Sequence, residues 1–251
     1  MSGHSKWASI KHKKGAADAK RGKIFTKHAK LIAIAAKNGP DPDTNPGLRS
    51  AIDGAKSANV PNSNIDRAIK KGSGQDKDAA TYEEIFYEGF GPAGTALYVQ
   101  VLTDNKNRAL SEVKSTLSKK GGGMGAAGSV AWMFERKGLI AVPLSEGVDP
   151  DEVELAAIDA GASDTAREES VLEVHTGASD LAKVRDTLKE SGIVIEEADI
   201  TYLPKQTVKI EGEDDARKVL GLIEMLEENE DVAEVYCNFD MDDELMAKAS
   251  N

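Results

Sequence analysis

The sequence has a single cysteine and no long apolar run. Cys237 allows no disulfide within the chain, no Cys-x-x-Cys pair offers a structural zinc site, and with no basic neighbour it is expected to be a buried thiol. No apolar stretch approaches the roughly 18 residues of a membrane-spanning helix. The N-terminal residues are basic but lack the apolar segment of a secretory signal. We therefore expect a cytoplasmic protein in a reducing compartment, with no membrane partner.

Signatures of catalysis and of bound cofactors are also missing. Gly123, Gly125 and Gly128 have G-x-G-x-x-G spacing, but a predicted helix precedes them and a predicted strand follows, which is the reverse of a dinucleotide site. We interpret residues 121–128 as a mobile loop. The four histidines have no cysteine or carboxylate set at ligand spacing. We expect no metal, no cofactor, no small-molecule substrate and no catalytic residue.

Charge is distributed unevenly along the chain. Residues 1–77 contain 16 Lys and Arg against 6 Asp and Glu, a net charge of +10, although the whole chain carries −11. Such an asymmetry indicates an end that binds a polyanion. The alternative is a solvated basic face without a partner.

The basic part begins with an arm in which lysines are interspersed with an aromatic residue. Lysines displace counterions from a nucleic-acid backbone, and an indole can stack on an unpaired base; Trp7 could instead anchor the arm on the following helices. A helix is predicted over residues 16–37, with lysines along the face opposite its apolar one. The predicted nucleic-acid contacts are Lys6, Trp7, Lys11, Lys13, Lys14, Lys20, Arg21, Lys23, Lys27 and Lys30.

Two shorter helices complete a predicted three-helix bundle. One begins at Pro46 with Asn45 as its cap, and the other begins near Ser63 and ends at Gly72. The loop between the first two helices is longer than the turn of a helix-turn-helix motif. The third helix offers residue types that touch bases or phosphates, although a solvated helix face looks the same: Asn62, Asn64, Arg67, Lys70 and Lys71.

The acidic remainder predicts two domains of mixed helix and strand. Strands expected at 84–88, 95–103, 129–135, 207–210 and 232–239, with helices at 107–119 and 214–228, form one domain. Two further strand-helix-strand units lie between them. We predict the α+β class: a bundle over residues 1–77, a discontinuous domain of 82–136 plus 204–240, and an inserted domain of 137–203, both of the split-βαβ (ferredoxin-like) type.

Several stretches resemble the YebC/PmpR family over nearly the whole chain, although Ala8–Ser9 and Leu31–Ala36 depart from the usual family pattern. These stretches are GHSKW (3–7), IKHKK (10–14), DAKRGKIFTK (18–27), VPNSNIDRAIKKGSG (60–74), YEGFGPAG (87–94), LTDNKNRA (102–109) and GGGMGAAGSVAWMFERKG (121–138).

The resemblance implies a helical bundle followed by two α+β domains, with no catalytic site. Members are described as DNA-binding transcriptional regulators, a mitochondrial relative activates translation of cytochrome oxidase, and bacterial members are linked to ribosomes stalled on proline-rich stretches. Two mechanisms stay open. In the first, the basic part binds promoter DNA while the acidic part contacts other proteins. In the second, the basic part binds ribosomal and transfer RNA on the ribosome.

A third hypothesis is an enzyme with its site between the acidic domains. Tyr87, Asp104 and Asn105 would form that site, near two glycine- and asparagine-rich turns. No nucleophile, metal set or cofactor loop accompanies them. We prefer a structural role, in which Asn105 and Asn107 suit a turn and a helix cap.

Overall fold

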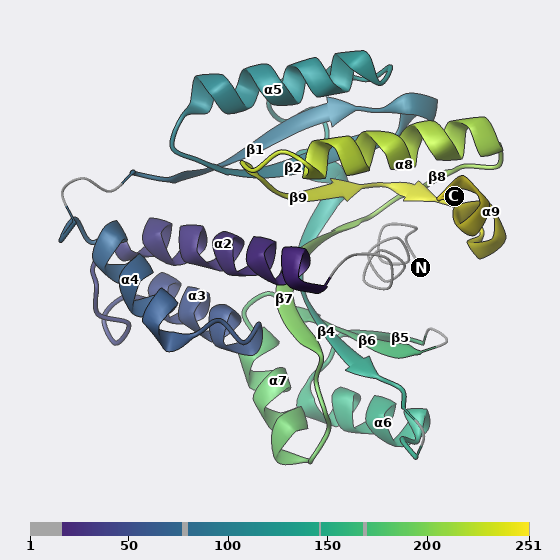
Figure 1. The fold of residues 1–251 in the computed structure, drawn as a ribbon. Coiled ribbons are helices and arrows are strands. Elements are labelled where there is room, and N and C mark those ends of the chain that lie inside the picture. The colour runs from purple at the N-terminus through teal and green to yellow at the C-terminus, as the bar shows by residue number, and fades with distance from the viewer. Residues whose placement is uncertain (1–16, 77–79, 146, 168–169, 251) are drawn as a thin grey trace. The chain divides into compact units, whose positions relative to one another are not determined.

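The computed structural model describes residues 17–76, 80–145, 147–167 and 170–250 of the 251-residue chain (Figure 1). The chain forms two compact units. One holds the residues up to Ala51 together with Asn62–Glu135 and Leu203 onward, and the other holds Ile52–Pro61 and Arg136–Tyr202. Within the described ranges, no helix combines the length and the apolarity that crossing a membrane requires.

Three helices form the N-terminal part: α2 (Ala17–Ala36), α3 (Pro46–Ser57) and α4 (Asn62–Gly72). The helix predicted over residues 16–37 is confirmed as α2, and α4 begins one residue before the expected Ser63. Both helices bury their apolar faces, with Ile32 on α2 and Ile65 on α4 at most 4% exposed.

Asn45 fixes the start of α3, as its sequence position predicted. Its Oδ1 accepts a hydrogen bond from the Leu48 N–H at 3.0 Å. Its Nδ2 donates to the carbonyl oxygens of Ala35 at 2.8 Å and Gly39 at 2.9 Å. One buried side chain thus caps α3 and satisfies carbonyl groups at the end of α2.

Helices α2 and α4 approach each other closely at Gly72. A Cβ atom on Gly72 would lie 2.1 Å from the carbonyl oxygen of Ala33. Backbone therefore packs against backbone here, which only glycine allows.

The first unit contains a four-stranded antiparallel sheet in the order β3-β1-β2-β9. Its strands are β1 (Glu83–Phe90), β2 (Ala96–Thr103), β3 (Gly123–Met124) and β9 (Val232–Cys237). Helices α5 (Lys106–Lys119) and α8 (Glu213–Glu227) cover one face, and α2 lies along the other (Figure 1). The core lies under α5 and α8, where Val99 and Val101 meet Leu117 and Ile223.

Two strands predicted for this domain differ in the structure: the strand expected at 129–135 is wrong, and the strand expected at 207–210 is present but lies in another sheet. Residues 131–133 form a 3₁₀ turn, and the next strand, β4 (Phe134–Pro143), belongs to the second sheet. β8 (Val208–Lys209) pairs with β10 (Phe239–Asp240) in a separate two-stranded sheet. In the four-stranded sheet, β3 lies at the edge next to β1. With two residues, β3 is too short to show strand periodicity. Helix α9 (Asp243–Ala249), which packs on α8, was not predicted.

The second unit contains the split-βαβ arrangement expected for the inserted segment. Its elements after β4 are α6 (Pro150–Ala160), β5 (Asp164–Arg167), β6 (Val171–Gly177), α7 (Leu181–Glu190) and β7 (Glu197–Pro204). The sheet order is β5-β6-β4-β7, so each helix connects two strands with a third between them. Ile140, Leu172, Val174, Val184 and Leu188 form its core. The α+β class is confirmed.

Candidate nucleic-acid interface

The predicted contact residues fall into two groups. Lys6, Trp7, Lys11, Lys13 and Lys14 lie outside the described residues, and of Lys20 only the backbone is described, within α2. Arg21 is exposed on the same helix.

The other three lysines of α2 contact the first unit's own α+β part. Lys23 Nζ donates to the carbonyl oxygen of Glu227, and Lys27 Nζ lies 3.2 Å from Glu234 Oε2. Lys30 Nζ donates to the carbonyl oxygens of Leu102 at 2.9 Å and Glu230 at 2.8 Å. The face that the sequence predicted for phosphates therefore holds α2 against acceptors of the acidic domain.

Asp231 is a buried carboxylate near Lys30. Its side chain is 8% exposed and lies 3.7 Å from Lys30 Nζ. It also accepts hydrogen bonds from Thr103 Oγ1 at 3.0 Å and Arg108 Nη2 at 2.7 Å. These bonds with Asp231, and a further one with Asp104, raise the pKa of Arg108. Asp231 thus joins α2, β2 and α5.

The residues of the enzyme hypothesis support this same turn. Asn105 Oδ1 accepts from the Arg108 N–H at 3.1 Å, so Asn105 is the cap of α5, whereas Asn107 lies within the helix. Asp104 pairs with Arg108 at 2.8 Å, and the Tyr87 hydroxyl donates to the carbonyl oxygen of Lys106 at 3.2 Å. Each polar group therefore has a structural contact.

Helix α4 presents a different kind of surface. Arg67, Lys70 and Lys71 are exposed, and none of them forms an ion pair with another residue in the described ranges. Ile65 and Ala68 face inward, so the cations follow from the amphipathic pattern of the helix. Within the described ranges, this surface keeps its positive charge without an acidic partner.

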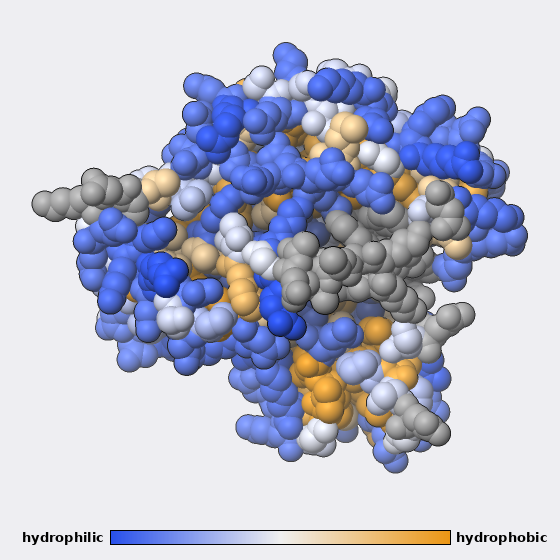
Figure 2. All heavy atoms as spheres, in the orientation of Figure 1, coloured by the Kyte–Doolittle hydropathy of each residue, from blue (hydrophilic) through white to orange (hydrophobic). Residues whose placement is uncertain are grey.

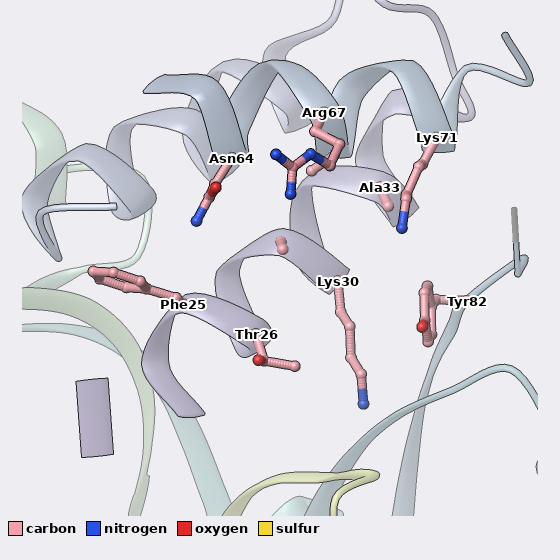
Figure 3. Close-up of a pocket in the computed structure, with 10 residues that line it drawn as sticks. Phe25, Thr26, Lys30, Ala33, Asn64, Arg67, Lys71 and Tyr82 are labelled. Carbon is pink, nitrogen blue, oxygen red and sulfur yellow. The ribbon is translucent and has the colours of Figure 1, made fainter. Parts of the chain in front are cut away.

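Between α2, α4 and the segment leading into β1 lies a hollow of about 270 Å³. Figure 3 shows Asn64, Arg67 and Lys71 extending from α4 toward it, with Tyr82 beside Lys30 at one side. Lys30 Nζ is 5.4 Å from the centre of the Tyr82 ring. The sequence singled out the α4 residues but not Tyr82, because nothing local links Tyr82 to helices that precede it.

The glycine-rich segment is held in place, so its interpretation as a mobile loop is wrong. Residues 123–124 form β3, and the buried Glu88 carboxylate accepts hydrogen bonds from the N–H groups of Gly128 at 2.6 Å, Val130 at 2.6 Å and Ala131 at 2.8 Å. Burial raises the pKa of Glu88, but these bonds outweigh it and leave the pKa lowered. The N–H groups that a phosphate would need are thus occupied by the chain's own carboxylate.

Two further kinds of reactive group can be assessed in the described residues: the single thiol and potential metal ligands. Cys237 is buried, as expected, and burial raises the pKa of its thiol to about 12. The part of the chain that the structure describes holds no group of three potential metal ligands. On the face shown in Figure 2 the first unit is largely hydrophilic, whereas apolar residues gather over part of the second, which carries the exposed Leu155, Ile158 and Val194. These properties leave the basic helices as the candidate site.

Comparison with known proteins covers almost the whole chain. A family model described as "TACO1/YebC protein N-terminal domain" matches residues 5–75, and one described as "TACO1/YebC second and third domain" matches residues 82–239. Relatives called "Probable transcriptional regulatory protein" come from Geotalea uraniireducens, 53% identical over 99% of both chains, and Halothermothrix orenii, 48% identical over 98% of both. The crystal structure of a conserved hypothetical protein, Aq1575 from Aquifex aeolicus, matches with a TM-score of 0.81 and 44% identity, covering 91% of this chain and 93% of that one.

Proposed function

Because the chain belongs to the TACO1/YebC family, as its motifs indicated, we propose that it regulates gene expression by binding nucleic acid and that it catalyses no reaction. Promoter DNA is the first candidate target, since the similar proteins bear the name of transcriptional regulators. In this proposal residues 1–77 bind the nucleic acid, and the acidic domains, 82–136 with 204–240 and 137–203, contact other proteins.

The observation that carries the proposal is the surface of α4. Arg67, Lys70 and Lys71 lie on the +10 part of a chain whose net charge is −11, and they are exposed without an ion pair within the described ranges. Uncompensated cations grouped on one helix attract a polyanion, and they displace counterions when they meet a nucleic-acid backbone. The N-terminal arm would add phosphate contacts through Lys6, Lys11, Lys13 and Lys14.

A second candidate target is ribosomal or transfer RNA. The hollow beside α4 combines cations with aromatic side chains, which suits folded RNA with unstacked bases better than a regular duplex. For Lys23, Lys27 and Lys30, phosphate contact stays a prediction, and it would require these residues to exchange their present acceptors for nucleic acid.

Crosslinking in living cells, followed by sequencing of the recovered nucleic acid, tests the proposal. We compare the wild type with the triple variant Arg67→Glu, Lys70→Glu, Lys71→Glu. The matched control, Lys114→Glu, Lys119→Glu, Lys189→Glu, changes net charge equally at exposed positions outside the basic part. Selective loss of recovery in the α4 variant, with an unchanged thermal melt, supports the proposal. Promoter fragments identify a transcriptional role, and ribosomal or transfer RNA a translational one; equal recovery in all three proteins contradicts the proposed site.

A further inference from the structure

The hollow between α2 and α4 has the size of a small ligand site. Its volume of about 270 Å³ lies just below the range of about 300–1,000 Å³ typical of pockets for drug-sized molecules. Ala29, Ala33 and Ala68 line it, so small side chains on both helices leave the space open. A single nucleotide suits this space better than a dinucleotide cofactor.

Aromatic rings lie at two places along the hollow. Tyr82 is half-buried on one side, where Lys30 Nζ lies 5.4 Å from the centre of its ring, and Phe25 lines the α2 side. Figure 3 shows the two rings on opposite sides of the space. Aromatic faces of this kind bind unpaired bases of any sequence by stacking.

Polar groups complete the requirements of a nucleotide. The Asn64 amide, half-buried on α4, can both donate and accept hydrogen bonds at a base edge. Arg67 and Lys71 stand one helical turn apart on the same helix, and their cationic groups suit a phosphate at the mouth of the hollow.

We propose that this hollow receives one unstacked nucleotide of a single-stranded segment, with the base against Tyr82 and the phosphate on Arg67 and Lys71. The inference rests on the proposed function and deepens it. A regular duplex keeps its bases stacked, so the hollow favours single strands, loops and ends.

The test compares neighbouring lysines in the full-length protein. Lys71 lines the hollow, whereas Lys70 is exposed on the same helix outside it. Fluorescence anisotropy measures binding to a labelled 12-nucleotide single-stranded RNA and to a 12-base-pair DNA duplex. We expect Lys70→Ala and Lys71→Ala to weaken duplex binding alike, because they remove the same charge. For the single-stranded RNA, we expect Lys71→Ala to lower the binding affinity several-fold more than Lys70→Ala does.

Tyr82 supplies a second, charge-independent readout. Tyr82→Leu weakens single-strand binding about tenfold by removing a stacking face, whereas Tyr82→Phe keeps it. A 2-aminopurine base in the RNA reports stacking by its fluorescence, which changes on binding to the wild type and to Tyr82→Phe only. Thermal melts confirm that each variant is folded.

The outcomes separate the two proposals. Equal losses for Lys70→Ala and Lys71→Ala on both probes, with no effect of Tyr82→Leu, overturn the nucleotide site and leave nucleic-acid binding standing. A wild-type protein that binds neither probe overturns the proposed function and this inference together.

Discussion

Helices α2 and α4 carry cations at similar density, but the fold uses them in opposite ways. Lys23, Lys27 and Lys30 on α2 contact acceptors of the acidic domain, whereas Arg67 and Lys71 on α4 form no ion pair within the described ranges. Positive charge in a sequence therefore does not identify a binding surface. A binding surface is better indicated by the cations that have no carboxylate or carbonyl partner among the described residues of the same chain.

The largest effect is expected where the two helices touch. Gly72→Ala places a Cβ 2.1 Å from the Ala33 carbonyl oxygen, and because the three nearest atoms all belong to the Ala33 backbone, no side chain can move aside. We expect a loss of about 3 kcal/mol of stability. Since the hollow lies between these helices, single-strand binding should fall as well.

Gly22→Ala is the matched control for this substitution. Beyond the neighbouring backbone of the helix itself, no described atom lies within 4 Å of a Cβ at Gly22, so the helix should gain up to about 1 kcal/mol. Urea unfolding monitored by circular dichroism measures both variants. A Gly72→Ala protein as stable as the wild type would show that α2 and α4 are not in backbone contact.

The second prediction concerns the acceptor side of α2. Asp231→Ala removes the common partner of Thr103, Arg108 and Lys30, and we expect it to cost about 2 kcal/mol, moderated because Arg108 remains partly solvated. Asp104→Ala, which removes a more exposed contact of the same arginine, should cost under about 1 kcal/mol. If urea unfolding shows equal losses of stability for Asp231→Ala and Asp104→Ala, Asp231 is not the main partner that joins these elements.

The third prediction concerns Glu88, a buried anion that binds backbone N–H groups of the same chain. Glu88→Gln removes the charge that binds the Gly128, Val130 and Ala131 N–H groups, at a cost of about 1 to 2 kcal/mol. Because the folded pKa of Glu88 lies below its usual value, its contribution is present above the unfolded pKa and is lost as pH falls through the folded pKa.

Trp132 reports this loss. With Trp7→Phe it is the sole tryptophan, and its fluorescence should change when acidification passes below the usual titration range of a glutamate, before global unfolding. The Glu88→Gln protein should lack that transition. The same transition in both proteins would assign it to another group.

The fourth prediction compares single lysines on the two helices. Lys30→Gln leaves the carbonyl groups of Leu102 and Glu230 without their donor and should cost about 1 kcal/mol. Lys70→Gln should stay within about 0.5 kcal/mol of the wild type, as surface substitutions usually do. Thermal unfolding distinguishes them, and equal stability of the two variants would contradict the docking role of α2.

The sequence predicted features that depend on near neighbours. Asn45 was identified as a cap, and Asn105 as one of two candidates for a turn and a cap, because a cap and its helix are adjacent in sequence. Helices α2 and α4 were found from their apolar periodicity. The partners of Lys30 could not be found in this way, because Leu102 and Glu230 are 72 and 200 residues away. The edge strand β3 has two residues, too few for a pattern, and Glu88 is 40 residues before the N–H group of Gly128. Which lysines already contact acceptors of the same chain thus depends on tertiary structure, which local sequence patterns do not contain.

The smallest effect is also the sharpest test of that conclusion. Each phosphate contact adds about 0.7 to 0.9 to the slope of log affinity against log salt. Lys70→Gln with Lys71→Gln should therefore flatten the slope by about 1.4 to 1.8, whereas Lys27→Gln with Lys30→Gln should leave it unchanged, because these lysines hold Glu234 and backbone carbonyl groups instead of phosphates. If the α2 pair flattens the slope equally, nucleic acid displaces those acceptors, and the face of α2 predicted from the sequence is part of the binding surface.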